Sequence, residues 1–523
     1  MSAAAGTGPQ GAISGAGPAA LKAGLNVPMI TATVMLTSIL QTLDNTIANV
    51  ALPRMQGTLS ATQDQMAWVL TSYIVAAAIM TPLAGWLAGR FGRKQLFVFS
   101  VIGFTATSAL CGLAQSLGQI VLFRFLQGLS GAALMPMSQA VLFDINPPER
   151  HGRAMAAWGQ AALLGPMLGP VVGGWLTDHY TWRWIFYINL PLGLIALAGV
   201  LVYMPKGATR VSRFDFTGFS LLGFALAMLQ LFLDRGPTQD WFGSVEIQAE
   251  AGAAALSFYL FVVHTATTRD PFLRASLFRD RNYLFGNIFI FVFSMVMFGS
   301  LTLVPTMLQE LLNYPVFDAG LITAPRGAGI LLGMLAVSRL MKYVDSRVLI
   351  ASGLGVGAVS LWQMTGFSAQ MDGRPTLWSS VVQGFGIGFS YVPAATAAFT
   401  TLSPLLRNEG TAVFNLSRNI GSSVGIAICQ ALLTRNRQIL HSSLAAHIVP
   451  YHLDAHDPAM AAALASSAGR FAIDARVQAQ ASWVAYVDDY QFMFYQTLAL
   501  IPMLILMRRT GGGTEGMQGA PID

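Results

Sequence analysis

The chain has 523 residues, of which 54% are hydrophobic and 10% are charged. A soluble globular domain carries roughly 25% charged residues, so this composition excludes a protein that water surrounds on every side. The formal net charge is +6. The basic residues lie between apolar segments and form no stripe, which argues against nucleic-acid binding and indicates loops beside a lipid bilayer.

Fourteen apolar segments are long enough to cross a bilayer, which takes roughly 20 helical residues. Each has to be helical, because a backbone exposed to lipid must satisfy its own hydrogen bonds. The sequence therefore predicts an all-α polytopic membrane protein with fourteen transmembrane helices. The predicted spans are 29–52, 66–89, 95–114, 118–142, 154–177, 184–204, 215–233, 248–266, 284–311, 319–341, 348–368, 376–401, 411–433 and 490–507.

The segments between the spans differ in charge between the two sides of the membrane. With an inside N-terminus, more than twice as many Lys and Arg residues fall inside as outside. Basic residues are enriched on the cytoplasmic side, so we expect both termini in the cytoplasm and the chain in the inner (plasma) membrane. Residues 1–25 are rich in Ala, Gly, Ser and Pro, and we expect them to be disordered. We expect the first span to be retained, because no cleavable signal peptide precedes it.

One long segment, 434–489, lies outside the predicted spans, on the external side. Its mixed charge and its Ala-rich stretch at 459–469 predict a partly helical external lobe. A loop of this length without structure is uncommon, so it is either functional or mobile. The lobe contains four histidines, which lack the tight spacing of metal ligands and are interrupted by Pro450. We therefore expect no metal site at His441, His447, His452 and His456.

Two ionisable residues inside the predicted spans are candidates for a functional role. Asp44 lies about fifteen residues into the first span, and Arg124 lies early in the fourth. A charge near mid-bilayer costs about 2.5–3.5 kcal/mol on insertion scales, so such residues normally face a cavity or a partner. A carboxyl between apolar surroundings and a nearby arginine can bind and release a proton. The alternatives are an Asp that caps a kinked helix and an Arg that extends to the interface.

The fifth predicted span contains a ridge of glycines interleaved with prolines. Gly165, Gly169 and Gly173 recur every four residues and therefore share one face of the helix. Small residues there allow two helix backbones to approach closely, and Pro166 and Pro170 are expected to bend the helix. The alternative interpretation is that these glycines only allow the ordinary packing of small residues between membrane helices.

A basic loop and two polar clusters complete the set of unusual residues. The loop 85–94 contains Gly85, Arg90, Gly92 and Arg93 and is at least a topology anchor. The chain has no GxxxxGK[ST] loop, so the sequence predicts no nucleotide cofactor and no ATP-driven transport. Polar residues inside spans either hold helices together or line a cavity. The candidates for a cavity wall are Asn45, Gln127, Arg326, Asn415, Arg418 and Asn419.

Several stretches resemble the major facilitator superfamily, and within it the fourteen-span drug:proton antiporters of the EmrB/QacA type. The first-span stretch LDNTIANVALP (43–53), the loop GWLAGRFGRK (85–94), the fourth-span stretch LFRFLQGLSGA (122–132) and the Gly-Pro ridge are similar to motifs of that family. APRG (324–327) and FNLSRNIGSSVG (414–425) resemble the EmrB branch. The resemblance covers residues 29 to 507.

This resemblance implies a division of the chain into two six-helix bundles, 29–204 and 283–507, separated by two inserted helices within 205–268. A cytoplasmic tail, 508–523, would follow. In the family, the halves rock around a central cavity. The resemblance implies that Asp44 is the protonation site, Arg124 its modulator, and Arg90 and Arg93 part of a cytoplasmic latch. The acid common in the loop motif is replaced by Gly89, which removes one charge contact from that latch.

The resemblance also implies a function. The chain is expected to be no enzyme but an antiporter that exports small hydrophobic or amphipathic compounds in exchange for protons. EmrB-like exporters work with a periplasmic adaptor and an outer-membrane channel of the TolC type, so such partners are expected here by analogy, with the external lobe as the contact. Two alternatives remain open: a proton-coupled importer on the same fold, and a membrane receptor or scaffold that transports nothing.

Overall fold

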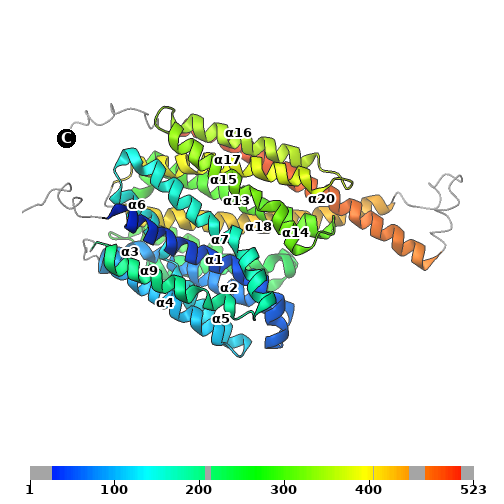
Figure 1. The fold of residues 1–523 in the computed structure, drawn as a ribbon, viewed down its shortest axis with the longest axis horizontal. Coiled ribbons are helices and arrows are strands. Elements are labelled where there is room, and N and C mark those ends of the chain that lie inside the picture. Colours follow the sequence, from blue (N-terminus) through cyan, green and yellow to red (C-terminus); the bar gives the residue numbers. More distant parts are fainter. Residues whose placement is uncertain (1–25, 206–213, 404–405, 447–465, 508–523) are drawn as a thin grey trace, which may run out of the picture.

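The computed structural model describes residues 26–205, 214–403, 406–446 and 466–507. The described chain is helical throughout, with short turns between the helices, and the long helices run roughly antiparallel in one elongated bundle (Figure 1). Residues 1–25, most of the Ala-rich stretch 459–469 and the tail 508–523 lie outside the described residues. Their predicted structure therefore stays a prediction.

The first half of the chain forms a bundle of six spans, three of which are broken into two helices. The helices are α1 (Val27–Leu59), α2 (Gln63–Met80) with α3 (Leu83–Phe91), α4 (Arg93–Leu113), α5 (Leu117–Gly131) with α6 (Leu134–Ile145), α7 (His151–His179), and α8 (Trp184–Tyr187) with α9 (Asn189–Tyr203). The α2–α3 pair is bent by 56° at Thr81 and Pro82. Proline lacks the N–H that would continue the helix, which accounts for the break.

The second half forms a similar bundle. Its helices are α13 (Arg281–Glu310), α14 (Val316–Thr323) with α15 (Pro325–Leu340), α16 (Ser346–Thr365), α17 (Gly373–Thr400), α18 (Arg407–Ala446) and α20 (Ser467–Met503). A short helix, α12 (Ser276–Arg279), precedes α13. Each predicted span falls on one of the helices of the two bundles or on the inserted pair. The exact domain boundaries stay predictions.

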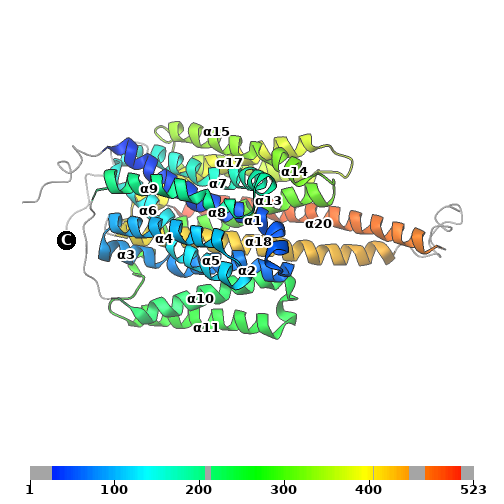
Figure 2. The same ribbon diagram turned by 60° about the horizontal axis from the view of Figure 1, so that its bottom comes forward.

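Two further helices, α10 (Phe216–Arg235) and α11 (Val245–Thr267), lie between the bundles in sequence and beside them in space. They pack against each other, and α10 packs on α2 and also touches α18 (Figure 2). Helix α10 thus contacts both bundles, whereas α11 lies on the outer side of the pair. The inserted pair covers one side of the junction between the bundles.

Ten described segments are apolar and long enough to cross a membrane, and the bent α2–α3 pair is an eleventh. Helices α17, α18 and α20 are not among these segments but run alongside them in the same bundle (Figure 1). Helices α18 and α20 are also longer than a bilayer requires. Their continuous helix places polar residues beyond the bundle.

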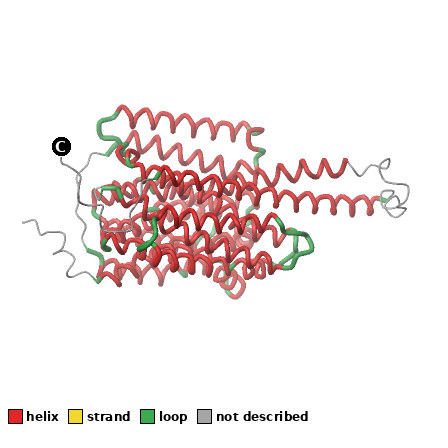
Figure 3. The backbone as a smooth tube through the Cα atoms, turned by 90° about the horizontal axis from the view of Figure 1, so that it is seen from above, coloured by secondary structure: helices red, strands yellow, loops and turns green. Residues whose placement is uncertain are grey.

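Helices α18 and α20 extend together past the end of the bundle as an antiparallel pair (Figure 3). We call the end from which they extend the hairpin side, and the opposite end, where α1 begins at Val27 and α20 ends at Met503, the termini side. Within the predicted lobe, residues 434–446 and 467–489 are helical and 447–465 are not described. Arg437 pairs with Glu310 of α13 at 3.0 Å where the pair leaves the bundle.

Candidate functional site

Asp44 lies in the middle of α1 and is completely buried in the first bundle. Its carboxylate accepts three hydrogen bonds from two other spans. Arg124 Nη1 of α5 donates to Oδ2 at 2.6 Å, Gln127 Nε2 donates to Oδ1 at 3.0 Å, and Asn189 Nδ2 of α9 donates to Oδ1 at 2.8 Å. A carboxylate held in this way is stabilised in its ionised form, because each donor contributes positive potential.

Arg124 is buried to the same degree, with a side chain that is 1% exposed. Its Nε donates to the carbonyl of Val69 at 3.2 Å, and its guanidinium carbon lies 4.3 Å from the centre of the Tyr73 ring. The alternative that Arg124 extends to the membrane interface is therefore wrong. Its guanidinium is held by a carboxylate, a carbonyl and an aromatic face, and a proton on Asp44 would weaken the first of these three contacts.

A cavity of about 380 Å³ lies between the two bundles. Arg124 and Tyr73 contribute to its wall, whereas Asp44 stands behind them. A proton or a substrate in the cavity therefore meets the guanidinium before it meets the carboxylate. Both bundles line the cavity, and so does the inserted helix α10 through Gln230.

The structure separates the predicted cavity residues into two groups. Four of them line the cavity: Asn45, Asn415, Arg418 and Asn419. Two do not. Gln127 faces Asp44 in the first bundle, and Arg326 of α15 is 5% exposed and points into the interior of the second bundle. Their predicted place in the wall is corrected, because neither side chain is among the described residues that line the cavity.

The cavity wall carries positive charge. Among the described residues that line it are Arg124 and Arg418 and no aspartate or glutamate. The Arg418 guanidinium carbon lies 5.9 Å from the Trp158 ring centre, and Nη2 lies 3.0 Å from Met135 Sδ. Phe293 and Met297 supply apolar surface beside these groups. The wall thus combines apolar area with cationic groups that no carboxylate in the wall neutralises.

The glycine ridge of α7 packs directly on α1 near Asp44. A Cβ atom on Gly165 would lie 2.2 Å from Thr42 Oγ1 and 2.5 Å from the Leu43 nitrogen, and one on Gly169 would lie 2.2 Å from Thr46 Oγ1. Thr46 Oγ1 also donates to the Gly165 carbonyl at 3.0 Å. Gly173 is buried further along the helix, and α7 is continuous through Pro166 and Pro170. Only glycine permits this approach, which fixes α1 and its carboxylate.

The two bundles meet on the termini side of the cavity. Arg93 at the start of α4 pairs with Asp144 at the end of α6, and Arg407 at the start of α18 pairs with the same carboxylate at 3.2 Å. Arg93 Nε also donates to Asn408 Oδ1 at 2.9 Å. Asp144 therefore supplies the acid that the loop lacks at Gly89. This structure is closed on the termini side.

Gly85 and its loop neighbours occupy different places around this contact. A Cβ on Gly85 would lie 3.0 Å from the Glu409 Cα, so the α3 backbone touches the start of α18. Gly92 adopts a positive φ of 85°, which a residue with a side chain rarely adopts. Arg90 is exposed and has no ion pair within the described part of the chain. Of the two arginines expected in the latch, Arg93 is the one that contacts the other bundle.

Replacing Asp144 with alanine should weaken closure on the termini side. Partly exposed ion pairs contribute up to about 1 kcal/mol, so we expect the population open on that side to rise by roughly fivefold. Spin labels at Arg90 and Tyr343, both exposed on the termini side and one in each bundle, would report the change as longer distances. As a control, Asp178→Ala removes an exposed ion pair with Arg54 elsewhere. If Asp144→Ala left the distances between the two spin labels unchanged, Asp144 would not contribute to closure on the termini side.

Several site residues were missed by the sequence reasoning. Asn189 and Tyr73 hold the Asp44–Arg124 pair, Trp158 faces Arg418, and Asp144 joins the bundles. Asn189 had a usable signal, because it is a polar residue in the second turn of the predicted span 184–204. The others resemble ordinary core or loop residues in the sequence, and only the tertiary contacts distinguish them.

No group of His, Cys, Asp and Glu suited to a metal ion occurs among the described residues. His441 of α18 contacts Asp474 of α20 at 2.9 Å across the hairpin. The other three histidines of the lobe lie outside the described residues.

A cavity between two six-helix bundles, with a buried ion pair beside it, is the arrangement of a membrane transporter. The chain belongs to the Major Facilitator Superfamily, whose profile matches residues 34–426. It is similar to the multidrug export protein EmrB of Escherichia coli, with 33% identity over 83% of this chain and 85% of EmrB. It is also similar to the fatty acid resistance protein FarB of Neisseria gonorrhoeae, with 35% identity over 83% of this chain and 86% of FarB.

Solved structures share the fold at low sequence identity. The human organic anion transporter MFSD10 aligns with a TM-score of 0.58 and 15% identity, over 90% of this chain and 99% of the other. A bacterial homologue of the human lysosomal transporter Spinster, in an inward-facing conformation, aligns with a TM-score of 0.53 and 15% identity, over 92% and 97%. At this identity the likeness supports the fold alone.

Proposed function

We propose that the protein exports small hydrophobic or amphipathic compounds in exchange for protons and acts as a multidrug efflux permease. The observation that carries this proposal is the Asp44–Arg124 pair. The carboxylate is fully buried, it lies one side chain behind the cavity, and its partner Arg124 forms part of the cavity wall. Proton binding at Asp44 therefore changes the wall that a substrate contacts.

The proposed cycle alternates access to the cavity between the two sides. A proton from the hairpin side neutralises Asp44 and removes the charge that holds Arg124. The guanidinium then rearranges, substrate affinity falls, and substrate leaves. After the bundles rock, the proton leaves Asp44 toward the termini side and the ion pair re-forms. Because α1 is packed against α7 along the glycine ridge, a change at Asp44 is transmitted to the helix that crosses toward the second bundle.

The available driving force is sufficient for such a cycle. A pH difference of one unit supplies about 1.4 kcal/mol for each proton exchanged. Each charge moved through 100 mV adds about 2.3 kcal/mol. One proton per cycle under a one-unit pH difference therefore supports a roughly tenfold substrate gradient.

The cavity favours neutral or anionic substrates over cationic ones. Of the two guanidinium groups in its wall, Arg124 is paired with Asp44, whereas Arg418 has no carboxylate partner among the described residues, and an anion beside Arg418 would gain a charge-assisted hydrogen bond. Apolar side chains such as Phe293 and Met297 would accept the hydrocarbon part of the substrate. The names of the relatives, multidrug export and fatty acid resistance, agree with compounds of this kind.

We place the termini side in the cytoplasm and the hairpin side outside the membrane. The excess of Lys and Arg in the loops of the termini side supports this orientation. The α18–α20 hairpin then extends into the periplasm, where it is the surface we assign to an adaptor that leads to an outer-membrane channel. The length of the hairpin beyond the bundle supports a contact at a distance from the bilayer.

Purified protein in liposomes tests the proposal. With an imposed pH difference, we expect a hydrophobic dye or a fatty acid to move against the proton flow, and a cationic dye to move more slowly. Substrate added to detergent-solubilised protein should release protons into a weakly buffered solution. Movement of substrate together with protons would identify an importer instead. Binding without movement or proton release would indicate a receptor.

A further inference from the structure

A second buried carboxyl group, Asp489, lies on α20 in the second bundle. Its side chain is 0% exposed, and neither carboxylate oxygen has a hydrogen-bond partner among the described residues. Helix α20 packs there against α13, α16 and α18. The surroundings are apolar and include Tyr486, Met493 and Cys429, each no more than 3% exposed.

The contrast with Asp44 determines the charge state of Asp489. Asp44 has three donors, one of them a guanidinium, and is stabilised as an anion. An unpaired ion in a protein interior costs several kcal/mol even after relaxation, and a carboxyl in such a place takes up a proton instead. Asp489 is therefore neutral in the conformation that is closed on the termini side. In this conformation, Asp44 is therefore charged and Asp489 is uncharged.

Other ionisable groups near Asp489 do not supply a partner. Asp488, its neighbour, is half-buried, and Cys429 of α18 faces it without donating a hydrogen bond. Tyr490 donates to Met307 Sδ at 3.5 Å. Toward the hairpin side, Tyr486 donates to Glu310 at 3.1 Å, and Glu310 in turn pairs with Arg437. These contacts are made without Asp489.

One cation of the second bundle is also unpaired. The Arg326 guanidinium of α15 is buried, and its Nε and Nη2 have no partner within the described part of the chain. Tyr490 lies within electrostatic reach of both Arg326 and Asp489. An ionised Asp489 would therefore be attracted toward Arg326, and a movement of α20 against α15 is the change that would bring them together.

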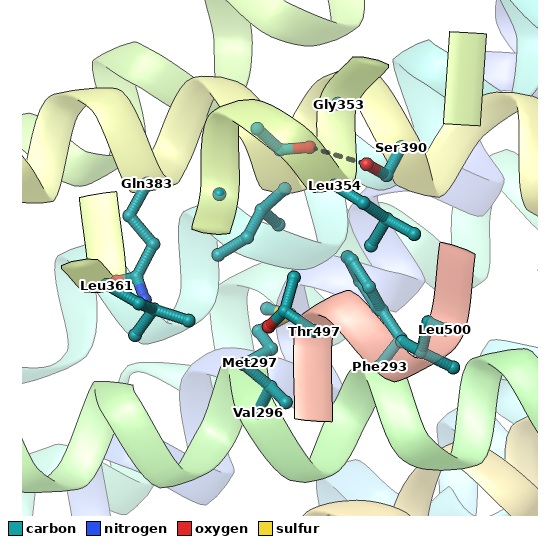
Figure 4. A pocket seen from close by; sticks show the side chains of 13 residues that line it. Phe293, Val296, Met297, Gly353, Leu354, Leu361, Gln383, Ser390, Thr497 and Leu500 are labelled. Atoms are coloured by element: carbon teal, nitrogen blue, oxygen red, sulfur yellow. Dashed lines mark hydrogen bonds between the residues drawn. The ribbon is translucent and has the colours of Figure 1, made fainter. Parts of the chain in front are cut away.

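A small cavity lies on the termini side of Asp489, about two turns further along α20, and adjoins the central cavity. Asp489, Met493, Thr497 and Leu500 follow one face of α20 at helical spacing. Thr497 and Leu500 line a space of about 20 Å³ together with Gln383 and Ser390 of α17 (Figure 4). That volume suffices for a water molecule, and the lining offers it polar partners. Three residues line both this space and the central cavity: Phe293, Met297 and Ile387.

We propose that Asp489 is a second proton-binding group, so that each transport cycle carries one proton on Asp44 and another on Asp489. The proposal rests on the proton-coupled export proposed above. Asp489 takes its proton from the hairpin side while the termini side is closed. After the bundles rock, it releases that proton toward the termini side through the small cavity, while its carboxylate is drawn toward Arg326.

Proton counting on purified full-length protein tests this proposal. Substrate binding should release fewer protons from Asp489→Asn than from the wild type, by one per bound substrate, while substrate affinity stays within about twofold. The matched control is Asp488→Asn, which neutralises the adjacent half-buried carboxyl and should release as many protons as the wild type. Equal release from Asp489→Asn and the wild type would overturn the inference and leave the role of Asp44 intact. No release from the wild type would overturn both proposals.

A second measurement requires no variant at Asp489. Dicyclohexylcarbodiimide adds to protonated carboxyl groups in apolar surroundings. In the wild-type protein, we expect mass spectrometry to find the adduct on Asp489, with a yield that falls as pH rises, and much less adduct on Asp44. A yield at Asp489 that does not change with pH would show a carboxyl that never releases its proton, and would overturn the inference even if Asp489→Asn failed to fold.

Discussion

Asp44→Asn should remove the part of pH-driven transport that the proton on Asp44 carries. Asparagine keeps the shape of the side chain and accepts the hydrogen bond from Arg124, but it cannot take up or release a proton. The roughly tenfold substrate gradient that one pH unit supports for one proton should therefore be lost. Under a one-unit pH difference, proteoliposomes with this variant would accumulate dye to a gradient roughly tenfold smaller than the wild type does. Any accumulation that still follows the pH difference would have to depend on another carboxyl.

The same variant should keep its ability to exchange substrate for substrate. Exchange requires the cavity and the rocking of the bundles but no net proton movement. Removing one partner of a buried ion pair costs up to about 3–5 kcal/mol, so some loss of stability is expected. Arg124 keeps the Val69 carbonyl and the Tyr73 ring, which limits that loss. Asp178→Asn, an exposed carboxyl, serves as the control. Loss of exchange together with driven transport would indicate a purely structural role for Asp44.

The fold was predictable because a bilayer leaves a chain few alternatives. Long apolar segments have to become helices, and their lengths and separations are visible in the sequence. The breaks within spans were less visible. Thr81 and Pro82 separate α2 from α3 inside one apolar segment that was predicted as a single span. The end of the thirteenth helix was also not visible, because its apolar run stops before Arg435 and Arg437 although α18 continues to Ala446.

The candidate site was predictable only in part, because it is made of contacts between distant helices. Asp44 was identifiable as an acid deep in an apolar segment. The position of Arg124, early in its span, is equally suited to the interface, and the structure buries it because Asp44, Val69 and Tyr73 surround it. Arg418 and Asn419, which were candidates for the cavity wall, line the cavity because α18 faces the junction of the bundles.

The missing acid in the basic loop shows how a tertiary contact replaces a local one. Gly89 lies at the position where the family that this chain resembles commonly has an acidic residue. The glycine cannot make the charge contact that the acid would make. In the structure, Asp144 at the end of α6 accepts both Arg93 from the first bundle and Arg407 from the second. The closure is therefore made by residues that are 51 and 263 positions apart in the chain. The sequence motif of the basic loop alone does not reveal a contact between residues so far apart in the chain.

Gly165→Ala should destabilise the protein and slow transport, although it adds one methyl group. The new Cβ would lie 2.2 Å from Thr42 Oγ1 and 2.5 Å from the backbone nitrogen of Leu43. The Thr42 hydroxyl can rotate, but the backbone of α1 cannot yield without moving Asp44, which is one residue further along. Overpacking costs about 1–3 kcal/mol. We expect a lower melting temperature and weaker coupling between proton release and substrate binding.

Gly174→Ala on the same helix is the matched control. No atom lies within 4 Å of the position of its Cβ, and alanine favours a helix over glycine by about 1 kcal/mol. This variant should melt at the same or a higher temperature and transport normally. If Gly165→Ala behaved in the same way, α1 and α7 would not be held at the distance described here. The positioning of Asp44 by the glycine ridge, on which the proposed transmission from Asp44 to the second bundle depends, would then be wrong.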